Sequence, residues 1–98
     1  AVALATDLNP GSCFTQSIPL LIALACYNMN LSLEEVITAL TINAASALSR
    51  EKLVGSIYVN KQGDLIILKY PSYKFLLYNL GTNIVHQVIK KGVLVKTN

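Results

Sequence analysis

Residues 1–12 read AVALATDLNPGS, an apolar run that ends in a cluster of polar and turn-forming residues. A continuous apolar run is typical of a strand that is buried on both faces, as in a parallel sheet. We therefore expect a strand over Ala1–Thr6, with Asp7 directly at its carboxyl end. In a parallel barrel, this is the end from which catalytic side chains project. The same residue types also form turns, so a plain turn is the alternative interpretation.

Two helices are expected after this segment. The first should extend from Ser17, which can cap it, to Asn30, and it is apolar on nearly every side. A helix of that kind must be covered by protein all round. The second is expected over Leu33–Leu48, where apolar residues recur at helical spacing behind a capping-box pattern of Ser32 and Glu35.

The second half of the chain has the pattern of β-structure. Strands are expected over Gly55–Val59, Asp64–Tyr70, Ile84–Ile89 and Val93–Lys96, with a hairpin turn at residues 90–92 and an irregular aromatic stretch over 71–80. The order of strand, helix, helix and then several strands predicts an α/β fold. It is typical of one βα unit of a larger barrel followed by part of a separate β-layer, which gives domains of 1–52 and 53–98.

The composition narrows the classes of function. The chain has 98 residues, of which 53% are hydrophobic and only 13% charged. So apolar a composition in so short a chain suggests that part of its surface is covered by other protein, either in an oligomer or in a larger fold. All eight basic residues lie in residues 50–98 but are scattered, so a solvated face is favoured over nucleic-acid binding. Two cysteines without a CxxC motif are typical of a reducing compartment. The most apolar run, Ile18–Tyr27, has about half the roughly 20 residues of a membrane span.

Candidate chemistry is confined to residues 7–12. The chain has one histidine, His86, so it cannot form a complete metal site or a Ser-His-Asp set alone. An aspartate at a strand end can ligate a metal and take a proton from water. Asn9 offers an amide donor and an acceptor, Gly11 allows close approach of the backbone to a ligand, and Ser12 adds a hydroxyl.

Several motifs resemble those of one enzyme family. Residues 5–12, ATDLNPGS, resemble the A-[ST]-D-x-N-P-G-[ST] segment of the imidazolonepropionases of the amidohydrolase superfamily. Residues 41–48, TINAASAL, resemble the T-x-N-A-A-x-A-L helix that is common across amidohydrolases. Residues 55–67 resemble the superfamily's G-S-I and A-D-L-V-I strand pair, and residues 71–92 the tyrosine-rich stretch and closing strands. The match covers essentially the whole chain in order.

The resemblance implies a fold and a site. The chain would be the C-terminal fragment of a distorted (β/α)8 amidohydrolase barrel, together with strands of a small composite β-sandwich. One divalent metal, zinc or iron, would have Asp7 as a ligand, and Asp7 would also act in catalysis. Asn9, Gly11 and Ser12 match positions that contact substrate or product. The chain departs from the family pattern, away from the metal segment, at Ser49, Asn60, Gly63 and Leu77.

The resemblance also implies an activity. It is the hydrolytic ring opening of 4-imidazolone-5-propanoate to N-formimidoyl-L-glutamate, a step of histidine degradation, in the cytoplasm. The partners would be this small substrate, the remaining barrel of the same protein and, in a homodimer, a second copy. Because the chain carries only one of the family's metal ligands, we expect no activity from it alone.

Two alternatives stay open. The first is another amidohydrolase, such as a deaminase or a cyclic-amide hydrolase, although Asn9-Pro10-Gly11 after Asp7 argues against it. The second is a non-catalytic domain that binds a partner protein through the apolar first helix. His86 is interpreted as a packed or surface histidine, the tyrosines as packing residues and Cys13 as a small buried residue.

Overall fold

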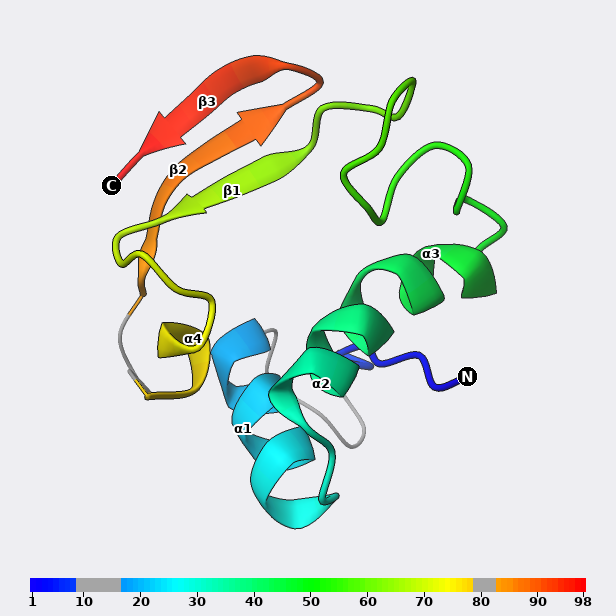
Figure 1. Cartoon of the computed structure of the whole chain (residues 1–98), viewed down its shortest axis with the longest axis vertical. Coiled ribbons are helices and arrows are strands. Elements are labelled where there is room, and N and C mark those ends of the chain that lie inside the picture. The colour runs from blue at the N-terminus through cyan, green and yellow to red at the C-terminus, as the bar shows by residue number, and fades with distance from the viewer. Residues whose placement is uncertain (9–16, 79–82) are drawn as a thin grey trace.

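The computed structural model describes residues 1–8, 17–78 and 83–98 of the chain (Figure 1). The elements are, in order, α1 (Ile18–Asn28), α2 (Leu33–Leu40), α3 (Ile42–Ala47), β1 (Leu65–Leu68), α4 (Phe75–Tyr78), β2 (Val85–Lys90) and β3 (Val93–Thr97). Figure 1 shows α1, α2 and α3 on one side and the three strands on the other, with α4 beside α1. The expected mixture of helices and strands is thus present.

The helical side is held together by a small apolar core. Ile22 and Ala25 of α1 pack with Leu33 and Val36 of α2, and Val36 is fully buried. Leucines from α4 and from the first segment pack against this cluster from outside. Burial of this kind is the main force that fixes the positions of the helices.

Both predicted helix starts are confirmed. The Ser17 hydroxyl accepts a hydrogen bond from the backbone amide of Leu20 at 3.3 Å. At α2, the Ser32 hydroxyl accepts the Glu35 amide at 3.1 Å, while the Glu35 carboxylate accepts the Ser32 amide at 3.0 Å. These two reciprocal bonds form the capping box that the sequence indicates.

The predicted single helix over Leu33–Leu48 is wrong in one respect, because it is divided at Thr41. The backbone of Thr41 has φ −110° and ψ −89°, outside the helical region, so α2 ends there and α3 begins at the next residue. The Thr41 hydroxyl and amide both donate to the Ile37 carbonyl, at 2.7 and 3.1 Å. A hydroxyl bonded in this way to the carbonyl four residues earlier is compatible with the end of a helix, but Thr38 makes the same bond to the Glu34 carbonyl inside α2 without a break.

The strand predicted over Ala1–Thr6 is not observed. The Leu4 amide donates to the carbonyl of Ala39 in α2 at 3.0 Å, and the Asn43 side chain donates to the Val2 carbonyl at 2.8 Å. A strand needs a neighbouring strand to accept and donate its backbone bonds. Helices occupy that place in the described part of the chain, so the apolar run packs as an irregular segment.

The sheet is antiparallel, with strand order β1-β2-β3. In its register, Leu65 pairs with Ile89 and Lys90 pairs with Val93. The turn between β2 and β3 consists of Lys91 and Gly92, whose φ angles of 50° and 77° are both positive. Positive φ at both central residues is the mark of the type I′ turn, whose twist matches that of the strands it joins. The predicted hairpin and the strands beginning near residues 64, 84 and 93 are confirmed.

A second predicted strand, Gly55–Val59, is not observed. Ile57, Tyr58 and Val59 are 87%, 76% and 78% exposed and belong to an irregular segment between α3 and β1. Their β-forming side chains lack a neighbouring strand among the described residues, and strand formation depends on such a neighbour. The stretch expected to be irregular over 71–80 contains the short helix α4, whose Phe75 stacks on Tyr70 with ring centroids 4.7 Å apart.

Candidate functional site

Asp7, the predicted metal ligand, lies near the end of the first described segment. Its side chain is exposed, and its backbone has φ 52°, in the left-handed region. Aspartate and asparagine enter this region more readily than other residues with a side chain. The other predicted site residues, Asn9, Gly11 and Ser12, lie outside the described residues.

Two hydrogen bonds hold the segment that leads to Asp7 against the helices. The Leu4 amide bonds to the Ala39 carbonyl, and the Leu4 side chain packs against the helical core. Two residues earlier, the Val2 carbonyl accepts the Nδ2 of Asn43 on α3. Sequence reasoning missed this role of Asn43, because the two bonded residues are 41 positions apart.

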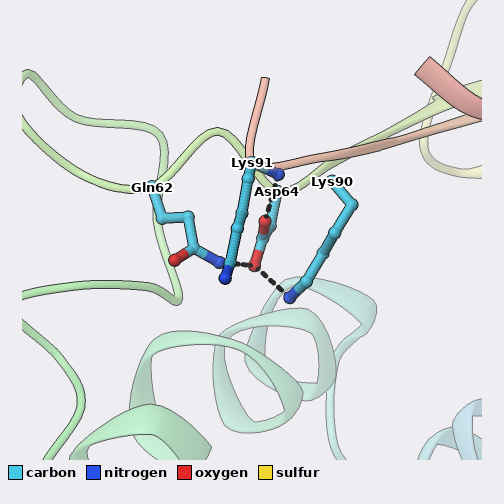
Figure 2. Close-up of polar contacts among 4 residues, drawn as sticks. All are labelled: Gln62, Asp64, Lys90 and Lys91. Carbon is cyan, nitrogen blue, oxygen red and sulfur yellow. Dashed lines mark hydrogen bonds and ion pairs between the residues drawn. The ribbon is translucent and has the colours of Figure 1, made fainter. Parts of the chain in front are cut away.

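Asp64, which lies in the motif that resembles A-D-L-V-I but had no role assigned from the sequence, holds one end of the sheet together (Figure 2). Asp64 Oδ2 accepts hydrogen bonds from the Lys90 ammonium at 2.8 Å and from the Gln62 side-chain amide at 2.7 Å. Asp64 Oδ1 accepts the backbone amide of Lys91 at 2.9 Å. The hydrogen bond from Lys90, and then that from Lys91, lower the pKa of Asp64 to about 2. A carboxylate with so low a pKa stays ionised at neutral pH, so it acts as a fixed acceptor and not as a proton carrier.

A second polar contact links the helices to the segment before α4. The Tyr73 hydroxyl donates to the Glu34 carboxylate at 2.9 Å, across 39 positions of sequence. The Glu34 backbone amide, followed by the Tyr73 hydroxyl, lowers the pKa of Glu34, and the same bond raises the pKa of Tyr73. Both side chains are exposed, so the contact is screened by solvent and contributes little to stability.

A groove of about 510 Å³ lies between the helices and the start of the sheet. Its walls are mainly apolar and come from α2 and α3 on one side and from residues 54–57 and β1 on the other. The polar side chains on its wall include Gln62 and Asp64, which already bond to each other. Because Gln62 and Asp64 bond to each other and Asp64 also bonds to Lys90, the groove offers mainly apolar contact area.

The described residues contain no complete set of metal ligands. No group of three or more His, Cys, Asp or Glu side chains comes together within residues 1–8, 17–78 and 83–98. His86 is a residue of β2, and its Nδ1 lies 3.2 Å from the Asn98 carbonyl oxygen at the end of the sheet. The exposed carboxylate of Asp7 fits a divalent metal as one oxygen ligand, since both zinc and iron accept carboxylate ligands. None of the helices in the described ranges is long and apolar enough to span a membrane.

Comparison with known proteins identifies close relatives. The chain is 62% identical to the imidazolonepropionase of Parabacteroides distasonis over 94 residues, which are 96% of this chain and 23% of that protein. It is 56% identical to the imidazolonepropionase of Porphyromonas gingivalis over 98 residues, which are 100% of this chain and 23% of the relative. It is 61% identical to that of Clostridium tetani over 95 residues, 97% of this chain and 23% of the relative. The chain thus spans about a quarter of the length of these relatives, and it matches their C-terminal regions.

A solved structure and a family model agree with these relatives. The crystal structure of an amidohydrolase from Thermotoga maritima superposes with a TM-score of 0.66 at 26% sequence identity, over 82% of this chain and 19% of that chain. The model of the amidohydrolase family matches residues 1–95. The resemblance of the motifs to the imidazolonepropionases is confirmed by these identities, and the chain belongs to the amidohydrolase family.

Proposed function

We propose that this chain is part of an imidazolonepropionase, which opens the ring of 4-imidazolone-5-propanoate to N-formimidoyl-L-glutamate in histidine degradation. The observation that carries the proposal is the 62% identity to a protein of that name, over 96% of the chain. Seven further relatives that share the name, at 52% to 61% identity, give the same support. Another amidohydrolase activity, such as deamination, has no comparable support.

The architecture proposed for the complete enzyme divides the chain in two. Residues 1–52 form the last βα portion of a distorted (β/α)8 barrel, and residues 53–98 form part of a β-sandwich. Helices α1 to α3 lie within residues 1–52 and all three strands within residues 53–98, which supports this division. Helix α4 belongs to the second part by sequence but lies beside α1 (Figure 1). In the barrel, Ala1–Thr6 would find neighbouring strands, and the exposed apolar side chains of Ile57, Tyr58 and Val59 would be covered.

The proposed site uses the segment that begins with Asp7. Asp7 would hold one divalent metal, zinc or iron, together with ligands from the rest of the enzyme. Such a metal supplies hydrolytic chemistry by making water acidic enough to act as a nucleophile near neutral pH. Asn9, Gly11 and Ser12 would bind the polar edge of the substrate through an amide, a close backbone approach and a hydroxyl.

The side chains of this segment have defined tasks in the proposed reaction. Water adds across the ring amide: its oxygen bonds to the carbonyl carbon, the C–N bond breaks, and a proton reaches the nitrogen. The carboxylate of Asp7 would accept the proton from the attacking water and return it to the leaving nitrogen. The enzyme would work in the cytoplasm, with the remaining barrel of the same polypeptide as its partner and a second copy in a homodimer.

The test is an assay of the complete open reading frame that encodes these residues. The purified protein should consume 4-imidazolone-5-propanoate, release N-formimidoyl-L-glutamate and contain zinc or iron by elemental analysis. Residues 1–98 expressed alone should show neither activity nor retained metal. A complete protein that leaves imidazolone propanoate intact but acts on other cyclic amides or on amino-substituted rings would refute the proposal.

A further inference from the structure

Helix α4 lies between β1 and β2 in the sequence but packs on the helices. Leu76 and Leu77 of α4 contact the apolar core that α1 and α2 form. Figure 1 shows α4 beside α1, reached from the end of β1 by an irregular segment. The part of the chain that carries the sheet therefore supplies two leucines to the packing of the helices, and both leucines are half-buried there.

Two further contacts define the path of residues 70–78. Phe75 of α4 stacks on Tyr70, with ring centroids 4.7 Å apart, and Tyr70 comes two residues after the end of β1. The Tyr73 hydroxyl donates a hydrogen bond to the carboxylate of Glu34, the second residue of α2, at 2.9 Å. This exposed hydrogen bond adds little stability, so the leucine contacts supply most of the energy that holds the segment against the helices.

The contact with α4 leaves a separate face of α1 for the rest of the barrel. Ile22 of α1 is buried in the core that α4 covers. At about 100° per residue, Leu20 and Leu24 project from the side of the helix opposite to Ile22. Their side chains are 46% and 44% exposed. The remaining barrel can therefore cover α1 without displacing α4.

The superposition on the amidohydrolase from Thermotoga maritima supports this arrangement. It covers 82% of the chain, which is more than residues 1–52 or residues 53–98 could supply alone. Elements of both parts therefore superpose together on a protein of which this chain matches only 19%. The placement of the sheet part beside the helices is thus shared with a larger amidohydrolase, and it does not require that the rest of the barrel be absent.

A second attachment joins the two parts where the chain leaves α3. Gly55 has φ 100°, and a Cβ at this position would lie 2.8 Å from Ala45 Cβ and 3.1 Å from the Thr41 carbonyl oxygen. The backbone at residue 55 therefore lies directly on α3, closer than a residue with a side chain allows. Figure 1 shows this attachment and α4 at separate places along the helices. A part that is held at two separated points cannot swing about either one.

We propose that residues 70–78 form a strap that fastens α1 and α2 to the sheet part of the chain. The strap is closed by the contact of Leu76 and Leu77 with the helical core. Leu77 is one of the positions at which the chain departs from the family pattern, so its contact is not a requirement of the motif. The strap concerns how the two parts are held together, so it does not depend on the metal, the substrate or residues 9–16.

The test is limited digestion of the complete polypeptide with trypsin, which cleaves after lysine and arginine. Lys74 is exposed and directly precedes α4, so cleavage after Lys74 requires only that the strap leaves the helices. Because a protease cuts a locally unfolded segment, the rate of this cleavage measures the population of the open strap. Leu77→Asp places a charge in the apolar contact. Tyr78→Asp is the matched control, since Tyr78 is the next residue of α4 and is 72% exposed.

We expect Leu77→Asp to accelerate cleavage after Lys74 by at least about 10-fold, because an unpaired charge is excluded from an apolar contact. The amides of α1 should exchange with solvent faster in this variant, while those of β2 and β3 exchange at the wild-type rate. Leu77→Ala, which keeps the position neutral, should accelerate the cleavage by about 5-fold. Leu77→Met and Tyr78→Asp should stay within about 2-fold of the wild type.

Three results would overturn the strap. The first is equal cleavage after Lys74 in Leu77→Asp and Tyr78→Asp, and the second is faster cleavage with wild-type exchange in α1. If Leu77→Asp also speeds exchange in β2 and β3, the fold as a whole is damaged and Leu77→Ala decides, with wild-type cleavage in that variant as the third result. None of these measurements involves a substrate, so they decide on the strap whether or not the protein opens the ring of 4-imidazolone-5-propanoate.

Discussion

The Asp64 carboxylate lies 2.8 Å from the Lys90 ammonium, and this pair joins the start of β1 to the end of β2. The same carboxylate accepts the Lys91 backbone amide, so it also holds the turn between β2 and β3. The backbone supports this arrangement, because the Gly92 amide donates to the Gly63 carbonyl at 2.9 Å. One side chain therefore ties all three strands together at one end of the sheet.

The Asp64 pair predicts a pH dependence of stability. The pKa of Asp64 is about 2 in the folded chain, below its ordinary value of 3.8. A lowered folded-state pKa means that the ionised carboxylate contributes stability above about pH 4, and that this contribution is lost as the pH falls toward 2. In thermal denaturation of the complete protein, Asp64→Asn should have a lower Tm at pH 7 and a smaller fall in Tm between pH 4 and pH 2. Equal pH dependence of Tm in the wild type and in Asp64→Asn would contradict the pairing of Asp64 with Lys90. Lys90→Arg keeps a positive charge at this position and should retain most of the wild-type pH dependence of Tm.

The turn between β2 and β3 predicts a cost for a methyl group at Gly92. A Cβ at Gly92 would meet no atom within 4 Å, so the cost of Gly92→Ala comes from its φ of 77° alone. We expect roughly 1–2 kcal/mol of lost stability in the hairpin, measured by hydrogen exchange of the β2 and β3 amides. Lys91→Asn is the matched variant, because asparagine tolerates the φ of 50° better than lysine, and it should slow the same exchange.

The capping box predicts the effect of Ser32→Ala. Alanine keeps the backbone but removes the oxygen that accepts the Glu35 amide at 3.1 Å. Loss of such a cap costs about 1 kcal/mol, so the amides of α2 should exchange faster and the Tm should fall. Ser46→Ala, at an exposed position inside α3, should change stability by less than about 0.5 kcal/mol. Similar losses in the two variants would show that the cap is not the cause.

The proposed site predicts the effect of Asp7→Asn in the complete enzyme. Asparagine keeps the size of the side chain and tolerates the same left-handed backbone, but it lacks the negative charge and cannot accept a proton at neutral pH. We expect kcat to fall by roughly 10³-fold and the metal content to drop, with little change in Tm. Asp64→Asn is the control carboxylate, and it should retain metal and kcat at temperatures where the sheet is folded. Normal metal content in Asp7→Asn would remove Asp7 from the ligand set.

The elements that the sequence predicted well depend on chemistry within a few residues. Ser32 and Glu35 are three positions apart, and Lys91 and Gly92 are adjacent, so the cap and the hairpin turn follow from local geometry alone. The strands predicted over Ala1–Thr6 and Gly55–Val59 failed for the opposite reason. A strand exists only with a neighbour, and β-propensity in a segment does not say whether the chain provides one.

The candidate site shows the same limit. Asp7 could be proposed from the sequence, because an acidic residue after an apolar run has a recognisable pattern and matches a family motif. The contact of Asn43 with Val2 could not be predicted from the sequence, because no periodicity relates residues 41 positions apart. The position of Asp64 at the start of a strand was predicted, but its pairing with Lys90 was not, because a contact across 26 positions requires the sheet register.

The left-handed backbone at Asp7 has a consequence for how this position can vary during evolution. Glutamate would preserve the negative charge but disfavours a φ of 52°, whereas asparagine and glycine suit the backbone but carry no charge. Aspartate is the acidic residue that suits this backbone better. If Asp7 holds the metal as proposed, a change to glutamate at position 7 should therefore be tolerated less well than the shared charge alone would suggest.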